Sequence, residues 1–252
     1  MQALQRLKFR LSHDLLYNLH ELAYDINEFV HKISTYPALI VVCGLKPMLK
    51  EVNHLLQLHL ITSQQLLSYD TTFQLGDFYM STLLVRNILF KKSPVMPTMF
   101  LLHKRKLHTT HLEMMQIVAS QLPSLVHGKA RIPMVTDDEK GFIHAVDQTL
   151  PNVQRFYCWN HIIISAKLWL RNHGAESNEI PIYVSHLRDL FHQATRKDYD
   201  DRFEELKVDL SEAFLLYYMK GIHNEVSKIG SITLVNFISC NYRLLTSCVN
   251  GI

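Results

Sequence analysis

Short apolar runs rich in aromatic and β-branched residues constrain the fold of this chain more than any other feature. Three such runs follow one another at residues 64–73, 78–90 and 98–103. They are separated by Gly76-Asp77 and by Ser93-Pro94, which are turn-forming pairs. This spacing predicts three strands joined by short turns, which is an antiparallel meander.

Helical periodicity then alternates with further strands. Residues 109–122, 140–150 and 161–173 are predicted helices, and residues 132–136 and 153–158 are predicted strands between them. This order predicts an α/β fold in which the first and fourth strands pair in parallel through a right-handed crossover.

Segments on both sides of this core also have a helical pattern. Apolar residues recur every three or four positions from Leu4 to Ile33, and a shorter amphipathic helix is predicted at residues 49–60. Beyond Gly174 the pattern is again helical, with charges typical of a solvated face. We therefore predict four regions: an N-terminal helical region (1–62), an α/β core (63–173), a further helical segment (174–230) and a divergent or truncated tail (231–252).

The composition is that of a folded protein without a membrane span. Of 252 residues, 48% are hydrophobic and 19% are charged, which excludes a disordered chain and a collagen-like fibre. The longest apolar run, residues 38–43, is much shorter than the roughly 18 residues that a span requires, so no membrane partner is expected. The four cysteines form no Cys-x-x-Cys pair, which favours a reducing, intracellular compartment. The net charge of +3 does not by itself indicate a nucleic-acid partner.

Two acidic residues end predicted strands: Asp70 ends the first, and Asp137 ends the fourth. Because ligands of α/β sheets collect at the carboxyl ends of neighbouring strands, we expect these two side chains to face each other. Adjacent carboxylates repel unless a cation lies between them, and Mg²⁺ prefers such oxygen ligands. The pattern predicts metal-assisted phosphoryl transfer on nucleic acid, although an Asp at a strand end also forms turns and helix N-caps.

Four motifs in a fixed order extend this hypothesis. They are Tyr69-Asp70-Thr71-Thr72-Phe73, Val135-Thr136-Asp137, Leu150-Pro151-Asn152 and Cys158-Trp159-Asn160-His161. Together they resemble the transposase domain of Mutator-like elements (MULEs), a branch of the DDE transposases, over residues 60–230.

The resemblance implies an α/β, RNase H-like mixed sheet flanked by helices, with a helical insertion and an N-terminal helical region. It implies that Asp70 and Asp137 are catalytic metal ligands and that Mg²⁺ or Mn²⁺ is the cofactor. DNA would be the substrate and partner, and the reaction would be metal-dependent strand cleavage and transfer, which is DNA transposition, in the nucleus. It leaves open whether the chain forms a homo-oligomer.

The third acidic ligand of that family has no match in this chain. The family has a Glu on a helix downstream of a stretch that resembles residues 221–230, whereas this sequence contains no acid after Glu225. We therefore expect a transposase fold with an incomplete active site, in a truncated or decayed copy or a gene model that loses the family's sequence near Gly230. Two alternatives stay open: a non-catalytic module that binds DNA or a partner subunit, and a metal-dependent nuclease of another lineage.

Two further groups of residues are candidates. Cys158 and His161 have the spacing of metal ligands, but no second Cys or His pair matches them, so a structural or positioning role beside the site is preferred to zinc. His108 and His111 are interpreted as a polar helix surface.

Basic residues gather in a stretch, between Asp77 and Glu113, that contains no acid. The candidate DNA-binding residues there are Lys91, Lys92, Lys104, Arg105 and Lys106. They predict salt-dependent contacts with a phosphate backbone, or else an edge strand protected by lysines.

Overall fold

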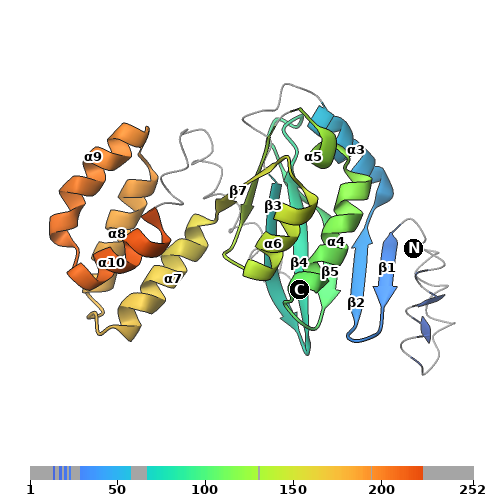
Figure 1. The fold of residues 1–252 in the computed structure, drawn as a ribbon, viewed down its shortest axis with the longest axis horizontal. Helices are drawn as coiled ribbons and strands as arrows, with labels where there is room; N and C mark the ends of the chain where they lie inside the picture. The colour runs from blue at the N-terminus through green and yellow to red at the C-terminus, as the bar shows by residue number, and fades with distance from the viewer. Residues whose placement is uncertain are drawn as a thin grey trace.

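The computed structural model describes residues 14, 17, 18, 20, 21, 23, 29–57, 67–129, 131–193 and 195–223. These residues form an α/β structure with a seven-stranded mixed sheet flanked by helices (Figure 1). The strand order is β1-β2-β5-β4-β3-β6-β7. No helix in this part of the chain is both long enough and apolar enough to cross a bilayer.

The predicted meander is confirmed in the middle of the sheet. Strands β3 (Leu67–Leu75), β4 (Phe78–Arg86) and β5 (Val95–His103) pair antiparallel in that order. Gly76 has a positive φ of 62° in the β3–β4 turn, a backbone conformation that glycine adopts without a steric penalty. The third strand begins earlier than predicted, because Pro97 is accommodated next to a register shift between Leu83 and Leu84, where it donates no ladder hydrogen bond.

The parallel half of the sheet is also confirmed. Strand β6 (Ile132–Thr136) pairs parallel with β3, and β7 (Val153–Tyr157) pairs parallel with β6. Their helices are α4 (His108–Gln121) and α5 (Ser124–His127) before β6, and α6 (Lys140–Thr149) before β7. The first and fourth strands of the predicted core are therefore neighbours.

The predicted helix from Leu4 to Ile33 is wrong at its C-terminal end. Residues 17, 18, 20, 21 and 23 are helical, but Val30–Ser34 form strand β1, antiparallel to β2 (Ile40–Gly44). The apolar run that forms β2 pairs on its other side with β5. This pairing, together with a 2.9 Å hydrogen bond between the His31 ring and the Gly44 carbonyl, overrides the local helical spacing. The other residues of the predicted helix lie outside the described residues.

The main hydrophobic core lies between the sheet and the helices α3 (Lys46–Gln57), α4 and α6. Helices α4 and α6 cross the same face of the sheet (Figure 1). Near its centre the rings of Tyr69 on β3 and Phe142 on α6 stack with centroids 3.8 Å apart. Both side chains are almost completely buried, so this stack supports β3 immediately before Asp70.

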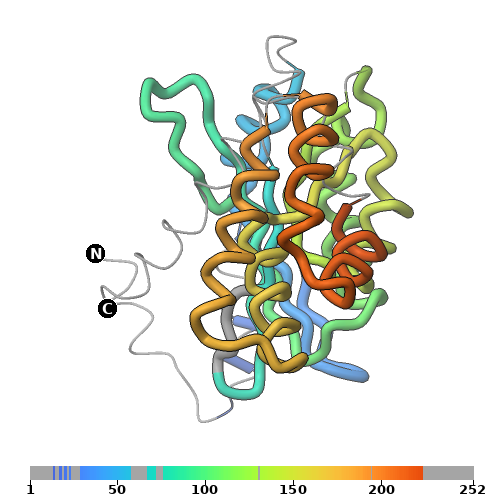
Figure 2. The backbone as a smooth tube through the Cα atoms, turned by 90° about the vertical axis from the view of Figure 1, so that its left-hand side faces the viewer, coloured from blue at the N-terminus to red at the C-terminus, as the bar shows by residue number. Residues whose placement is uncertain are grey.

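A second hydrophobic cluster joins four helices beside β7. They are α7 (Trp159–Asn172), α8 (Glu179–Phe191), α9 (Arg196–Leu206) and α10 (Glu212–Gly221), with a 3-10 helix, η2 (Lys207–Asp209), between the last two. They form a group beyond the β7 edge of the sheet, at the left of Figure 1 and in front of the sheet in Figure 2. The helical prediction for the segment after Gly174 is thus confirmed as far as residue 223, and the predicted tail lies outside the described residues.

Candidate metal centre

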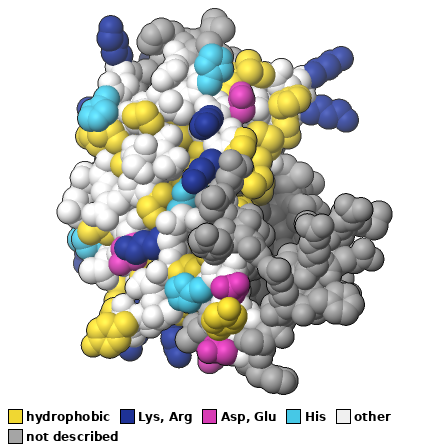
Figure 3. All heavy atoms as spheres, turned by 90° about the vertical axis from the view of Figure 1, so that its right-hand side faces the viewer, with side chains coloured by type: hydrophobic (Ala, Val, Ile, Leu, Met, Phe, Trp, Pro, Cys, Tyr) yellow, Lys and Arg dark blue, Asp and Glu magenta, His cyan; other side chains and the backbone are white. Residues whose placement is uncertain are grey.

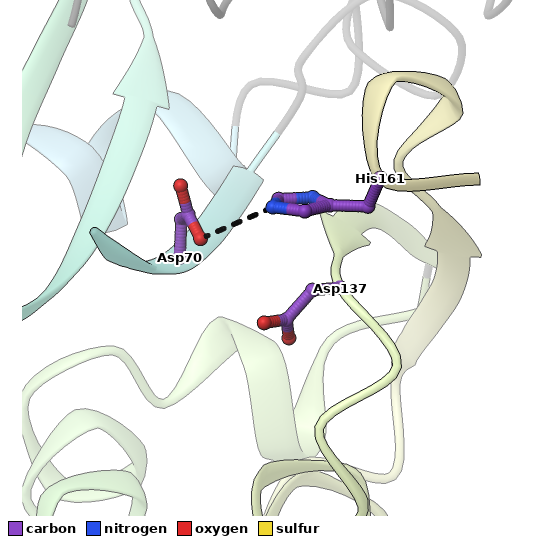
Figure 4. Close-up of side chains that lie close together, drawn as sticks. All are labelled: Asp70, Asp137 and His161. Carbon is purple, nitrogen blue, oxygen red and sulfur yellow. Dashed lines mark ion pairs between the residues drawn. The ribbon is translucent and has the colours of Figure 1, made fainter. Parts of the chain in front are cut away.

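Strand β3, the residue after β6 and the start of α7 bring Asp70, Asp137 and His161 together. Asp70 lies on β3 one residue beyond its pairing with β6, which ends at Tyr69 and Thr136. Asp137 directly follows β6, and His161 lies in the first turn of α7, after β7. The three side chains point toward one another from these elements (Figure 4). The expectation that Asp70 and Asp137 face each other is therefore met.

The distances suit one divalent cation. One ligand atom from each of the three side chains lies within 4.8 Å of the others. The His161 Nε2 and Asp70 Oδ1 atoms are 3.9 Å apart, and all three residues are partly buried. An octahedral ion with bonds of about 2.1 Å requires ligand separations of this order. Two carboxylates and one imidazole form a donor set that Mn²⁺ accepts, with the remaining positions left to water or phosphate oxygens.

Asp137 is held in a position unfavourable to its own charge. Burial, followed by the negative charges of Glu139 and Asp70, raises the pKa of Asp137, whereas a 3.2 Å hydrogen bond from the Glu139 backbone N–H to Oδ1 opposes the increase. A nearby cation stabilises the ionised form of such a carboxylate, because it offsets the negative charges around it. Asp137 therefore both accepts the hydrogen bond of a turn and is a candidate ligand for a cation.

His161 is oriented by its own motif. A hydrogen bond with Cys158 is the largest cause that raises the pKa of His161, and the charges of Asp70 and Asp137 raise it further, while burial opposes them. Cys158 is partly buried and unbridged, immediately before α7. The structure thus gives Cys158 a positioning contact and brings His161 into the ligand group, where the sequence indicated only a neighbouring motif.

Glu139, the residue immediately before α6, supports the candidate site. Its Oε1 accepts a very short hydrogen bond from His111 Nε2, and its Oε2 lies 3.7 Å from Lys106 Nζ. The His111 Nδ1 atom in turn lies 2.8 Å from the Tyr69 hydroxyl. In the neutral ring Nε2 donates to the carboxylate and Nδ1 accepts from the hydroxyl. Although burial opposes it, the His111 contact, with Lys106 and Thr71, lowers the pKa of Glu139.

This network corrects the interpretation of His111 as surface. The His111 side chain is completely buried, whereas His108 is only partly buried. The contact with His111 fixes the Glu139 side chain and, with it, the Glu139 backbone N–H. That N–H orients the Asp137 carboxylate. The pairing of residues 28 positions apart has no local sequence signal.

Replacing Glu139 with Ala is expected to lower the free energy of unfolding by about 1–3 kcal/mol, because the His111 donor would be buried without an acceptor. Glu139→Gln should recover most of this loss, since its amide oxygen still accepts. Urea denaturation measures both. Asp147→Ala, which removes a more exposed carboxylate paired with Arg155, should cost less than about 1 kcal/mol. Equal losses for Glu139→Ala and Asp147→Ala would contradict the structural role of the network.

The structure divides the predicted basic residues into two groups. Lys104, Arg105 and Lys106 follow β5, which runs parallel to β3, so they lie toward the same end of the sheet as Asp70. Lys91 and Lys92 lie in the turn between β4 and β5, at the opposite end. Only Lys106 contacts the surroundings of the candidate site, through Glu139.

Neither the protein-family models nor the curated proteins with which the chain was compared match it. The function of the chain is therefore inferred from the geometry of the candidate site and from the fold that positions it.

Proposed function

We propose that this chain is a divalent-metal-dependent phosphoryl-transfer protein of the DDE transposase type that acts on DNA, with Asp70, Asp137 and His161 as its metal ligands. The observation that carries the proposal is the convergence of two carboxylates from parallel neighbouring strands with an imidazole from the next helix. A bound divalent cation supplies charge that polarises a phosphodiester oxygen and lowers the pKa of a water molecule.

The architecture supports the RNase H-like part of this proposal. Three antiparallel strands, a crossover to a fourth strand parallel to the first, and a fifth parallel strand after another helix match the order that the resemblance to Mutator-like transposases implies. Further support comes from the segment after Gly174, which is helical where the resemblance implies a helical insertion.

The ligand set supports one ion rather than two. The described residues contribute two carboxylates and one imidazole, and these carry too little negative charge to organise a pair of divalent cations. Within the proposal, Asp70, Asp137 and His161 would hold the ion, which would supply positive charge beside the scissile phosphate. Slow phosphodiester hydrolysis is therefore a better match than the full strand-transfer reaction. The same incomplete set favours, as a second candidate, a DNA-binding module that retains the fold without catalysis.

A plasmid-nicking assay tests the proposal. The unmodified protein should convert supercoiled DNA to the nicked form with Mn²⁺ and lose this activity in EDTA. Asp70→Asn should reduce the rate by at least about 100-fold, since it removes one of two charged ligands. Asp77→Asn, at an exposed acid in the β3–β4 turn, is the matched control and should retain the rate. Nicking by Asp70→Asn at the unmodified rate would overturn the proposal, whereas Mn²⁺ and DNA binding without nicking would establish the second candidate.

Metal binding should strengthen as the pH rises. Burial, with the charges of Glu139 and Asp70, raises the pKa of Asp137, and the Cys158 hydrogen bond raises that of His161. Both groups bind a metal only after losing a proton, so protons compete with the ion at low pH. Mn²⁺ affinity, measured by calorimetry, should increase by about tenfold or more between pH 5.5 and 7.5, and less steeply in His161→Gln. A flat profile would exclude these ligands.

A further inference from the structure

The turn between β4 and β5 is held by internal hydrogen bonds and projects from the body of the molecule (Figure 2). Buried Asn87 anchors it: its backbone N–H donates to the Pro94 carbonyl at 2.9 Å, and its Oδ1 accepts from the Leu89 N–H at 3.0 Å. At the tip, the Ser93 N–H donates to the Phe90 carbonyl at 2.7 Å, and Ser93 has a positive φ of 41°. These hydrogen bonds hold the four residues 89–92 in a defined arrangement.

Two large apolar side chains lie exposed at this tip. Leu89 is 63% exposed and Phe90 is 57% exposed, and both are followed directly by the exposed Lys91 and Lys92. Apolar side chains stand beside projecting Lys or Arg side chains at the upper right of Figure 3. Adjacent exposed apolar side chains with polar neighbours are typical of interaction surfaces.

Cations flank β5 at both of its ends. Lys91 and Lys92 precede β5, whereas Lys104, Arg105 and Lys106 follow it, and no Asp or Glu occurs between Asp77 and Glu113. The nine residues of β5 span about 30 Å. That length corresponds to about nine base pairs of B-form DNA.

We propose that the β4–β5 tip is a DNA contact that inserts Leu89 and Phe90 between base pairs while Lys91 and Lys92 bind the flanking phosphates. Apolar wedges of this kind unstack a base step and kink the duplex, and a two-stranded hairpin fits within a groove. The inference rests on the proposed function only in taking DNA as the partner. It requires neither a metal ion nor catalysis.

Bending and binding of a 30-base-pair duplex, labelled at both ends with a fluorescence-transfer pair, test this inference in EDTA. The unmodified protein should bend the duplex. Leu89→Ser/Phe90→Ser should lose the bend and about tenfold in affinity, with an unchanged salt dependence. Lys91→Gln/Lys92→Gln should keep the bend but flatten the slope of log affinity against log salt by about 1.8. Val208→Ser, which removes an apolar side chain that is 85% exposed on η2, is the control and should match the unmodified protein.

Several outcomes would overturn the inference. They are an unmodified protein that does not bend the duplex, a serine double variant that bends it normally, and a serine double variant that instead changes the oligomeric state or loses binding to anionic vesicles. Thermal melts exclude misfolding as the cause, since both apolar side chains are exposed. If the tip variants behave normally while nicking still depends on Asp70, the inference fails and the proposed function stands. If the tip variants lose bending while nicking is independent of Asp70, the reverse holds.

Discussion

Changing Asp137 to Asn should weaken Mn²⁺ binding by at least about 100-fold and yet stabilise the metal-free protein. The loss follows from removing one of the two charged ligands of the candidate centre. The gain follows from the raised pKa of Asp137, since a carboxylate whose pKa is higher in the folded state than in the unfolded state destabilises the fold at neutral pH. Asn keeps the oxygen that accepts the Glu139 N–H, so the turn is retained.

Thermal melts with and without Mn²⁺ measure both effects. Saturating metal, at about 100 times its dissociation constant, should stabilise the unmodified protein by about 2.7 kcal/mol and the variant hardly at all. The unfolding temperature of the variant without metal should be equal to or above that of the unmodified protein. Asp77→Asn serves as the control, because its exposed carboxylate is remote from the centre in the β3–β4 turn. A variant that is less stable without metal, or that is stabilised normally by Mn²⁺, would show that Asp137 has a purely structural role.

Phe142→Ala should cost about 3–5 kcal/mol of unfolding free energy, which is the usual range for truncating a fully buried aromatic residue. The Phe142 side chain has no exposed surface, and its ring stacks on Tyr69. Its removal would leave a cavity directly beneath the strand that carries Asp70. We therefore expect the weakened protein to lose metal affinity as well.

Urea denaturation gives the size of this effect. Phe142→Leu, which refills part of the volume, should lose less than half as much. Leu216→Ala, at a side chain that is 66% exposed on α10, should stay within about 0.5 kcal/mol of the unmodified protein. A loss below about 1 kcal/mol for Phe142→Ala would mean that the stack does not support the site.

The sequence predicted the centre of the fold well because turn chemistry and periodicity agree there. Gly76-Asp77 precede β4 in the structure as in the prediction, and the helices before and after β7 begin and end near their predicted positions. The predicted end of that strand at residue 90 is wrong, because β4 ends at Arg86 and the following residues form the hydrogen-bonded turn before β5. The prediction that Asp70 ends its strand is wrong, because β3 continues to Leu75. Asp70 still meets Asp137, because the parallel partner β6 ends opposite Tyr69 and Asp137 follows it directly.

Long-range pairing accounts for most of what sequence reasoning missed. Strand β1 was predicted as helix because residues four positions apart share a face in a strand as well as in a helix. Its pairing with β2, which is formed only in the folded structure, decides between the two. The buried Glu139–His111 contact depends on the approach of α4 to the residue before α6, which no spacing encodes. His161 had a recognisable motif, but its place beside the two carboxylates depends on the start of α7.

Helix α7 contributes side chains both to the candidate metal centre and to the second hydrophobic cluster. His161 in its first turn belongs to the candidate metal centre, whereas the other sides of the helix pack into the second hydrophobic cluster with α8, α9 and α10 through Trp159, Ile162, Ile163 and Ala166. Binding of DNA or of another protein to those helices could shift α7 and would therefore move the His161 imidazole relative to Asp70 and Asp137. The metal affinity of the candidate centre would then depend on what binds to α8, α9 and α10.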